Sequence, residues 1–363
     1  MTDLFGEVKL GALTLPNRLV MAPLTRNRAD RDGVPGELAA TYYAQRASTG
    51  LIISEGTQPS AMAQGLPRTP GLHTEAQIDA WRAVTDAVHA AGGHVYCQLM
   101  HTGRVGHPDL VRHSSLRHGL LPMAPSAIPP LGMAKTYDGP KEFVPPRVMT
   151  RHDIEVTIAD FADGARNAIR AGFDGVELHS ASGVLPHQFL ADGANQRTDE
   201  YGGSVTNRVR FAVELSEAMA DAIGADRVGL RVSPGHRFMG LTESDVDDVY
   251  PELAHVVGKL GLVFLHVYET GNRPLTRVLR SRWPTAFIVN PHPDGGRASG
   301  TLADAKELLA DGTADLVSFG RLFIANPDLL HRFQAGLPLT EPDPTTFYEG
   351  EHRGYVDYPA YAP

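Results

Sequence analysis

Short apolar runs alternate with longer amphipathic stretches along most of the chain. The apolar runs have the length and composition of buried strands, and they are Arg18–Ala22, Gly50–Ser54, His94–Leu99, Phe173–Leu178, Arg227–Val232, Leu262–Val267, Ala286–Val289 and Asp315–Phe319. The stretches between them place apolar residues on one helical face, as Ile78, Trp81 and Val88 show. These predicted helices are Glu37–Thr49, Glu75–Ala91, Thr150–Ala171, Ser204–Ile223, Glu243–Lys259, Leu275–Arg282, Thr301–Ala310 and Asn326–Gln334.

Strands that are each followed by a helix predict a parallel sheet, because a parallel neighbour can be reached only through a crossover connection. A closed (β/α)8 barrel, the TIM barrel, is the simplest α/β fold for this pattern. An open doubly wound sheet is the alternative, but no G-x-G-x-x-G motif follows the first strand, which disfavours a Rossmann domain. No linker divides the chain, so we predict one barrel domain over residues 1–363.

Helix start signals support these assignments. Thr74 precedes one predicted helix, and Thr150 is followed by Asp153 at the spacing of a capping box. Thr242–Ser244 marks the start of a third helix in the same way.

Two segments fall outside the alternating pattern. Leu4–Leu15 is predicted to be a hairpin that closes the bottom of the barrel. Gly103–Met149, after the third strand, is rich in proline and histidine and has little periodicity. We predict a long loop there that lies over the carboxyl-terminal face and carries function, because structureless loops of that length in compact domains are usually functional.

Composition and charge narrow the class of protein. The chain has 363 residues, of which 42% are hydrophobic and 21% charged, which is typical of a globular protein. Its net charge of −9, without a cluster of lysine and arginine, argues against a nucleic-acid partner. A single cysteine, Cys97, excludes an intramolecular disulfide, and neither a secretory signal nor a membrane-spanning run is present. We expect a cytoplasmic protein, monomeric or homodimeric, that acts on a small molecule and has no membrane partner.

The residues at the ends of the predicted strands indicate the chemistry, because TIM barrels build their active sites there. These positions are rich in neutral hydrogen-bonding groups, and Glu55 and Glu177 are the only acids close to the mouth. Glycoside hydrolysis, which needs a pair of carboxylates, is therefore disfavoured. His101 and His179 could suggest zinc, but no His-x-His occurs, and we predict no metal site.

Two arginines at strand ends point to an anionic ligand. Arg231 and Arg321 follow the fifth and eighth strands, where a buried cation is costly unless an anion meets it. Gly320–Arg321 and the glycine-rich run Asp294–Gly300 stand where TIM barrels bind phosphate. Internal salt bridges of the two arginines are the alternative.

Several motifs, kept in order over nearly the whole chain, resemble the Old Yellow Enzyme family of flavin oxidoreductases. They are Pro16–Arg18 with Met21–Thr25, Ala63–Gly71, Trp81–His89, Gln98–Gly106, Asn195–Asn207, Gly229–Pro234 and Phe319–Leu329. The most specific are NQRTDEYGGS and FGRLFIANPDL. The resemblance implies FMN as the cofactor and NADPH or NADH as the electron donor, bound in the substrate pocket.

The resemblance also implies roles for individual residues. FMN would be held by Ala22, Pro23, Leu24, Thr25, Gly56, Gln98, Arg231, Gly320, Arg321 and part of Gly296–Gly300, including Gly300. In that arrangement Thr25 bonds the flavin O4, Gln98 pairs with the pyrimidine edge and Arg231 lies near N1 and O2. The substrate would contact Met100, His179, Ser182, Val184 and Tyr348, and the implied catalytic residues are His179, Ser182 and Thr25.

The chain departs from the family at the position of the usual proton donor. Family members typically carry His or Asn where this chain has Ser182, and a proton-donating Tyr where it has Val184. We expect reduction of activated C=C bonds in enones and maleimides, or of other electron-poor acceptors, with the proton taken from water or another group. Tyr137, Tyr268 and Tyr348 are candidate donors.

Three other functions stay open at this point. The acceptor could be a quinone or nitro compound, which needs no protonation of carbon. The chain could also be an isomerase or desaturase in a biosynthetic pathway. Finally, it could bind FMN without turnover.

Overall fold

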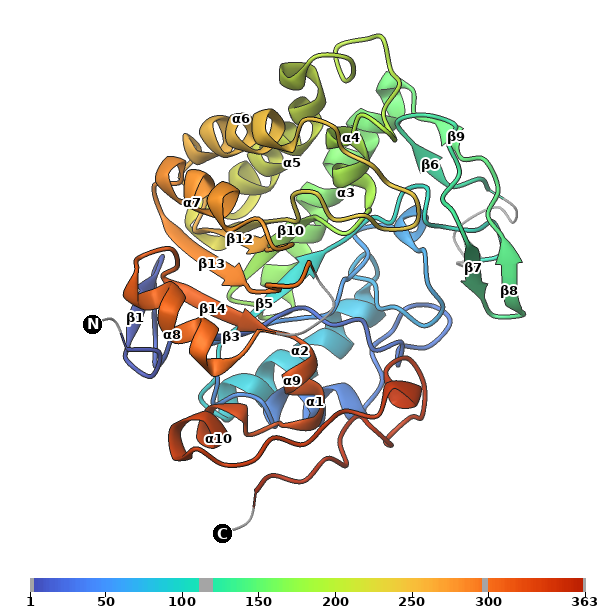
Figure 1. Cartoon of the computed structure of the whole chain (residues 1–363). Helices are drawn as coiled ribbons and strands as arrows, with labels where there is room; N and C mark the ends of the chain where they lie inside the picture. The colour runs from blue at the N-terminus through green and yellow to red at the C-terminus, as the bar shows by residue number, and fades with distance from the viewer. Residues whose placement is uncertain (1–2, 111–119, 296–299, 362–363) are drawn as a thin grey trace.

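The computed structural model describes residues 3–110, 120–295 and 300–361, and its centre is a closed barrel of eight parallel strands (Figure 1). Around the barrel the strands follow one another in chain order: β3 (Leu19–Met21), β4 (Leu51–Ile53), β5 (Val95–Leu99), β10 (Gly175–Ser180), β11 (Val228–Val232), β12 (Phe264–Tyr268), β13 (Ala286–Asn290) and β14 (Leu316–Phe319). The pairing of β14 with β3 closes the ring. The predicted (β/α)8 barrel is therefore confirmed.

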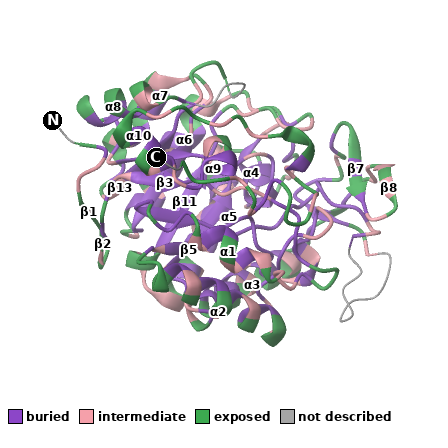
Figure 2. Cartoon of the chain, turned by 90° about the horizontal axis from the view of Figure 1, so that it is seen from below, coloured by how far each residue is buried: buried purple, intermediate pink, exposed green. Residues whose placement is uncertain are grey.

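Helices cover the outside of the barrel. They are α1 (Leu38–Ala44), α2 (Glu75–Ala90), α3 (Arg151–Arg170), α4 (Leu185–Leu190), α5 (Val205–Ile223), α6 (Val246–Gly258), α7 (Arg273–Arg282), α8 (Leu302–Ala310), α9 (Arg321–Ala325) and α10 (Leu329–Ala335). Each long helix buries one apolar face, as α2 does with Ile78, Trp81 and Val88, so that exposed residues lie on the periphery (Figure 2). No helix of these described residues is both long and apolar enough to cross a membrane.

Side-chain caps set several helix starts. Thr74 and Thr150 accept hydrogen bonds from the backbone of Gln77 and Asp153, which close capping boxes at α2 and α3. The predicted start of α6 at Glu243 is wrong, because the helix begins at Val246. The short helices α4 and α9 were not expected from the periodicity, since each is too short to show it.

The bottom of the barrel is closed by the predicted hairpin, formed by β1 (Val8–Leu10) and β2 (Leu13–Leu15). Leu10 and Leu15 join one apolar cluster with Val20, Ile53 and Phe264 of the barrel strands. An apolar plug at this end leaves the opposite end of the barrel for polar chemistry.

The segment after β5 is more regular than the sequence suggests. It carries β6 (Met123–Ala124) paired with β9 (Arg147–Val148), and the antiparallel hairpin of β7 (Met133–Thr136) and β8 (Gly139–Glu142). The expectation of a loop with little regular structure is wrong for these strands, which bury few residues and so leave little periodicity. Residues 111–119 lie outside the described part. The hairpin stands beside the barrel (Figure 1).

Candidate active site

A pocket of about 430 Å³ lies over the carboxyl-terminal end of the barrel. It is lined by all five residues expected to contact substrate, together with the expected catalytic threonine: Met100, His179, Ser182, Val184, Tyr348 and Thr25. Apolar side chains such as Leu66, Phe143 and Phe238 line much of the rest. A pocket of this kind suits a small, mostly apolar molecule with one hydrogen-bonding end.

His179 is the main polar group of this pocket. It is buried at the end of β10, and its Nδ1 has no hydrogen-bond partner among the described residues. Burial, together with the positive charge of Arg231, holds the pKa of His179 well below its usual range. The ring is therefore neutral at pH 7, and it can donate one hydrogen bond to a bound molecule without carrying a charge.

The turn between β10 and α4 presents the next two pocket residues. Ser182 adopts a left-handed conformation with φ of 51°, and its backbone N–H donates to Ser233 Oγ over 2.8 Å. Val184 is buried at the start of α4 and has no proton to give. The structure thus brings the two positions that differ from the family pattern into the same pocket as His179.

A buried support behind this turn was missed by the sequence reasoning. His187 Nδ1 accepts from the backbone N–H of Gly183 over 2.9 Å, and its Nε2 lies 3.0 Å from the Tyr250 hydroxyl. Glu243 accepts from that hydroxyl over 2.6 Å.

The arginine expected near the flavin, Arg231, pairs in register with His179 on the neighbouring strand. Arg231 is buried at the end of β11, and its Nη2 donates to Asn290 Oδ1 over 3.2 Å. Its Nε has no partner in the described part of the chain, and no carboxylate there forms a salt bridge with it. Burial lowers the pKa of Arg231, which expresses the cost of a desolvated cation. The salt-bridge alternative is therefore not supported for Arg231, and the site fits an anionic group.

Gln98 and Thr25 belong to the same part of the site, where the flavin ring is expected. Gln98 Nε2 donates to Glu177 Oε1 over 2.7 Å, so the amide oxygen is left for another group. The next residue after Thr25, Arg26, donates its backbone N–H to Glu55 Oε2 over 3.1 Å. Burial raises the pKa of Glu55 to about 7. The unpartnered Arg231 Nε, the free Gln98 oxygen and the Thr25 segment together fit a flat hydrogen-bonding ring such as isoalloxazine.

The remaining predicted cofactor residues lie around the ends of β3, β4 and β14. Ala22 pairs with the Phe319 carbonyl over 2.9 Å, and Pro23 and Leu24 continue the chain to Thr25. A Cβ at Gly56 would lie 2.6 Å from Met100 Sδ, so this glycine makes room for Met100. That the Gly56 backbone also approaches the flavin remains a prediction.

The structure describes some of the residues predicted to hold the FMN phosphate. Gly320 caps α9, whose first residue is Arg321, and Gly300 packs against Pro291 through a 3.0 Å backbone hydrogen bond. Residues 296–299 of the predicted phosphate loop lie outside the described residues.

An aromatic stack beside Arg231 was not expected. The Tyr268 and His292 rings stack with centroids 4.2 Å apart, and the Arg231 guanidinium carbon lies 5.8 Å from the Tyr268 ring centre. Both residues follow barrel strands, which was the signal available in the sequence. No group of three potential metal ligands occurs among the described His, Cys, Asp and Glu residues.

Comparisons with known proteins identify the family. Residues 3–340 match the model of the NADH:flavin oxidoreductase / NADH oxidase family. The chain belongs to this family, the Old Yellow Enzymes. It is 40% identical to chanoclavine-I aldehyde reductase of Penicillium roqueforti, covering 99% of this chain and 96% of that protein. It is also 40% identical to 12-oxophytodienoate reductase 1 of Oryza sativa subsp. japonica, covering 98% and 92%.

Solved structures agree with this assignment. The Old Yellow Enzyme homologue from Zymomonas mobilis superposes with a TM-score of 0.92 at 39% identity, covering 99% of this chain and all of that one. Morphinone reductase in complex with tetrahydroNAD gives a TM-score of 0.92 at 43% identity, covering 99% and 98%. The chain is thus an Old Yellow Enzyme, an FMN-dependent oxidoreductase that uses a nicotinamide donor.

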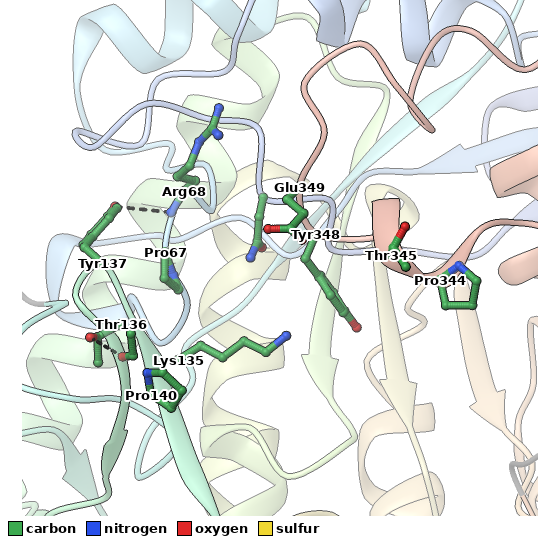
Figure 3. A pocket seen from close by; sticks show the side chains of 12 residues that line it. Pro67, Arg68, Lys135, Thr136, Tyr137, Pro140, Pro344, Thr345, Tyr348 and Glu349 are labelled. Atoms are coloured by element: carbon green, nitrogen blue, oxygen red, sulfur yellow. Dashed lines mark hydrogen bonds between the residues drawn. The ribbon is translucent and has the colours of Figure 1, made fainter.

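An outer cleft of about 580 Å³ adjoins the pocket of this Old Yellow Enzyme and shares Asn27, Lys135 and Tyr348 with it. In Figure 3 the Lys135 side chain extends toward Tyr348, and its Nζ lies 4.3 Å from the Tyr348 ring centre. Of the three candidate proton donors, Tyr348 alone lines the inner pocket. Tyr137 faces the outer cleft, where its hydroxyl accepts from the Arg68 N–H over 3.2 Å.

Proposed function

We propose that this Old Yellow Enzyme reduces activated C=C bonds of enones and maleimides with hydride that originates from NADPH or NADH. Support comes chiefly from one observation, the neutral His179 in a largely apolar pocket, paired in register with the buried Arg231, which forms no salt bridge among the described residues. The relatives named as reductases of 12-oxophytodienoate and of chanoclavine-I aldehyde agree with a reductase.

The residues present divide the work between cofactor and substrate. Thr25, Gln98 and Arg231 would hold the flavin ring, while Gly300, Gly320 and Arg321 would hold its phosphate. FMN, when bound, accepts hydride from the nicotinamide and delivers it to the acceptor. Arg231 favours the negative charge that the reduced ring carries.

His179 is proposed to donate its hydrogen bond to the carbonyl oxygen of the acceptor. Negative charge grows on that oxygen as hydride arrives, so the bond strengthens in the transition state. Ser182 reaches less far than the His or Asn of relatives and would help directly or through a bridging water.

Val184 cannot protonate the α-carbon, so the proton must come from water or from Tyr348. A placed general acid contributes roughly 10²–10⁴-fold to a rate, and its loss predicts slow enone turnover. The same observation favours a second candidate function, the reduction of quinones or nitro compounds, because these acceptors need no protonation of carbon at this point.

The pocket of about 430 Å³ is too small for a whole dinucleotide. We propose that the nicotinamide enters it while the rest of the donor extends into the outer cleft. The preference between NADPH and NADH, the cytoplasmic location and the oligomeric state remain predictions.

Anaerobic reduction followed by reoxidation tests the proposed function. The purified protein should be yellow and should bleach with NADPH or NADH, and cyclohexenone, menadione or a nitro ester should restore the colour. Tyr348→Phe should slow the cyclohexenone step alone if Tyr348 supplies the proton, with Tyr137→Phe as the matched control. If the protein is yellow but does not bleach, the reductase proposal fails and FMN binding stands. A protein that cannot bind FMN would contradict both.

A further inference from the structure

Four polar side chains form a hydrogen-bonded chain inside the barrel. Glu177 Oε1 accepts from Gln98 Nε2 over 2.7 Å, and Glu177 Oε2 lies 2.7 Å from His266 Nδ1. His266 Nε2 lies 2.8 Å from Ser318 Oγ. All four side chains are buried, and they come from the neighbouring strands β5 and β10 and from β12 and β14 (Figure 1).

Apolar side chains would fill this part of the barrel interior at a lower free-energy cost. Replacing buried ionic groups by well-packed apolar residues is often neutral or stabilising, and Val20, Leu51 and Ile53 of the barrel strands do form an apolar cluster with the N-terminal hairpin. The hydrogen-bonded chain adjoins the proposed flavin site, since Gln98 belongs to both. Its position therefore suggests a role toward the cofactor.

The partners determine where the protons are. Burial lowers the pKa of His266, so its ring is neutral. Glu177 accepts two hydrogen bonds and needs donors at both oxygens, which places the His266 proton on Nδ1. His266 Nε2 is then an acceptor, and Ser318 Oγ donates to it.

This arrangement fixes the amide of Gln98. Its NH₂ group must face the Glu177 carboxylate, because the flipped amide would bring two oxygens together. The amide oxygen and the second N–H then remain for a ring that offers a donor beside an acceptor.

Glu177 is also the negative charge that acts on Arg231. Its field favours the charged form of that guanidinium, whose direct partner is the neutral Asn290. Glu177 and Arg231 are both buried and lie on the paired strands β10 and β11. A negative charge on the strand beside Arg231 opposes the anionic charge that a reduced flavin would place there.

We propose that Glu177, held by His266 and Ser318, is a positioning residue that orients Gln98 for the flavin and holds down the flavin reduction potential through its charge. The inference rests on the proposed FMN site. Glu177 would act through Gln98, since its side chain contacts Gln98 and His266 and does not line the substrate pocket.

Glu177→Gln tests the proposal, because it keeps the shape of the side chain and removes its charge. We expect the FMN dissociation constant to rise about tenfold and the midpoint potential of the bound flavin to become more positive. Glu269→Gln is the matched control: Glu269 is also buried near the mouth, but it pairs with Arg273 and should leave the potential unchanged.

Ser318→Ala is the milder variant if Glu177→Gln does not fold. Without the hydroxyl, His266 Nε2 loses its donor, so the ring donates a weaker hydrogen bond to Glu177 and stabilises the negative charge of Glu177 less. The potential should then shift in the same direction by a smaller amount. A potential unchanged in both variants overturns the proposal while FMN binding and reduction by the native protein stand, and a native protein that binds no FMN overturns the proposed function itself.

Discussion

Arg231 and Asn290 are joined by a 3.2 Å hydrogen bond across β12, which separates their strands. Asn290 is itself held by a 2.8 Å hydrogen bond from its Nδ2 to the Ser318 carbonyl. A neutral amide orients the guanidinium without neutralising it. The cation is thus placed and kept available for an anion.

Replacing the amide by a carboxylate should remove that availability. Asn290→Asp would pair with Arg231, so the reduced flavin should be less stable and the midpoint potential more negative. Reduction of the flavin by NADPH, followed in a stopped-flow instrument, should slow by about tenfold, which corresponds to about 1.4 kcal/mol. Asn290→Ala removes the hydrogen bonds to Arg231 and to the Ser318 carbonyl without adding a charge, and equal potentials for the two variants would contradict this view of Arg231.

His179 should act as a neutral hydrogen-bond donor over the whole physiological range. Because its pKa lies well below the usual range, activity should not change between about pH 6 and 8 on account of His179. His179→Ala should lower kcat/KM for cyclohexenone by about 10²-fold, the cost of one donor to a developing oxyanion. A step in the native pH profile near 6.5 that vanishes in the variant would show that the ring titrates.

The parts of this structure that follow from local pattern were predictable. Parallel barrel strands bring their carboxyl ends together, so Met100, His179 and Val184, far apart in sequence, could be assigned to one pocket. The contact between Tyr268 and His292 could not, because nothing local indicates which loop residues will stack. The contacts of His187 with Tyr250 and Glu243 were unpredictable for the same reason, since they join residues far apart in the sequence.

Glu55 should make the stability of the fold depend on pH. Its pKa in the folded protein, about 7, is raised from 4.5 mainly by burial, so the folded state favours the protonated form. The contribution of Glu55 to the free energy of unfolding is complete below about pH 4.5 and is lost as the pH rises through 7. The total loss is about 3 kcal/mol.

Glu55→Gln removes this titration while keeping an acceptor for the Arg26 N–H. Between pH 5 and pH 8 the free energy of unfolding, measured in urea, should therefore rise for the variant relative to the native protein by about 2.5 kcal/mol. Parallel pH curves for the two proteins would show that Glu55 is ionised throughout.

The turn that carries Ser182 should accept the residue typical of relatives. Ser182 has φ of 51°, and asparagine tolerates this left-handed conformation better than most residues. Ser182→Asn should fold normally and add a second donor beside His179. We expect kcat/KM for cyclohexenone to rise about tenfold, the effect of roughly one hydrogen bond. If kcat/KM of Ser182→Asn does not rise, the carbonyl of the bound cyclohexenone lies out of reach of this turn.

Val184→Tyr should restore the missing proton donor. Val184 precedes α4 in an extended conformation, with φ of −77° and ψ of 173°, so a tyrosine fits the backbone, and the side chain at this position lines the pocket. Turnover of cyclohexenone should rise by roughly 10²–10⁴-fold, the contribution of a placed general acid. Menadione should gain nothing, because its reduction needs no proton on carbon.

Val184→Phe is the matched control, since it adds the same ring without the hydroxyl. It should narrow the pocket as the tyrosine does and leave the cyclohexenone rate at or below that of the native protein. If the phenylalanine and tyrosine variants behave alike, the hydroxyl is not the proton source, and water or Tyr348 already protonates the carbon as fast as hydride arrives.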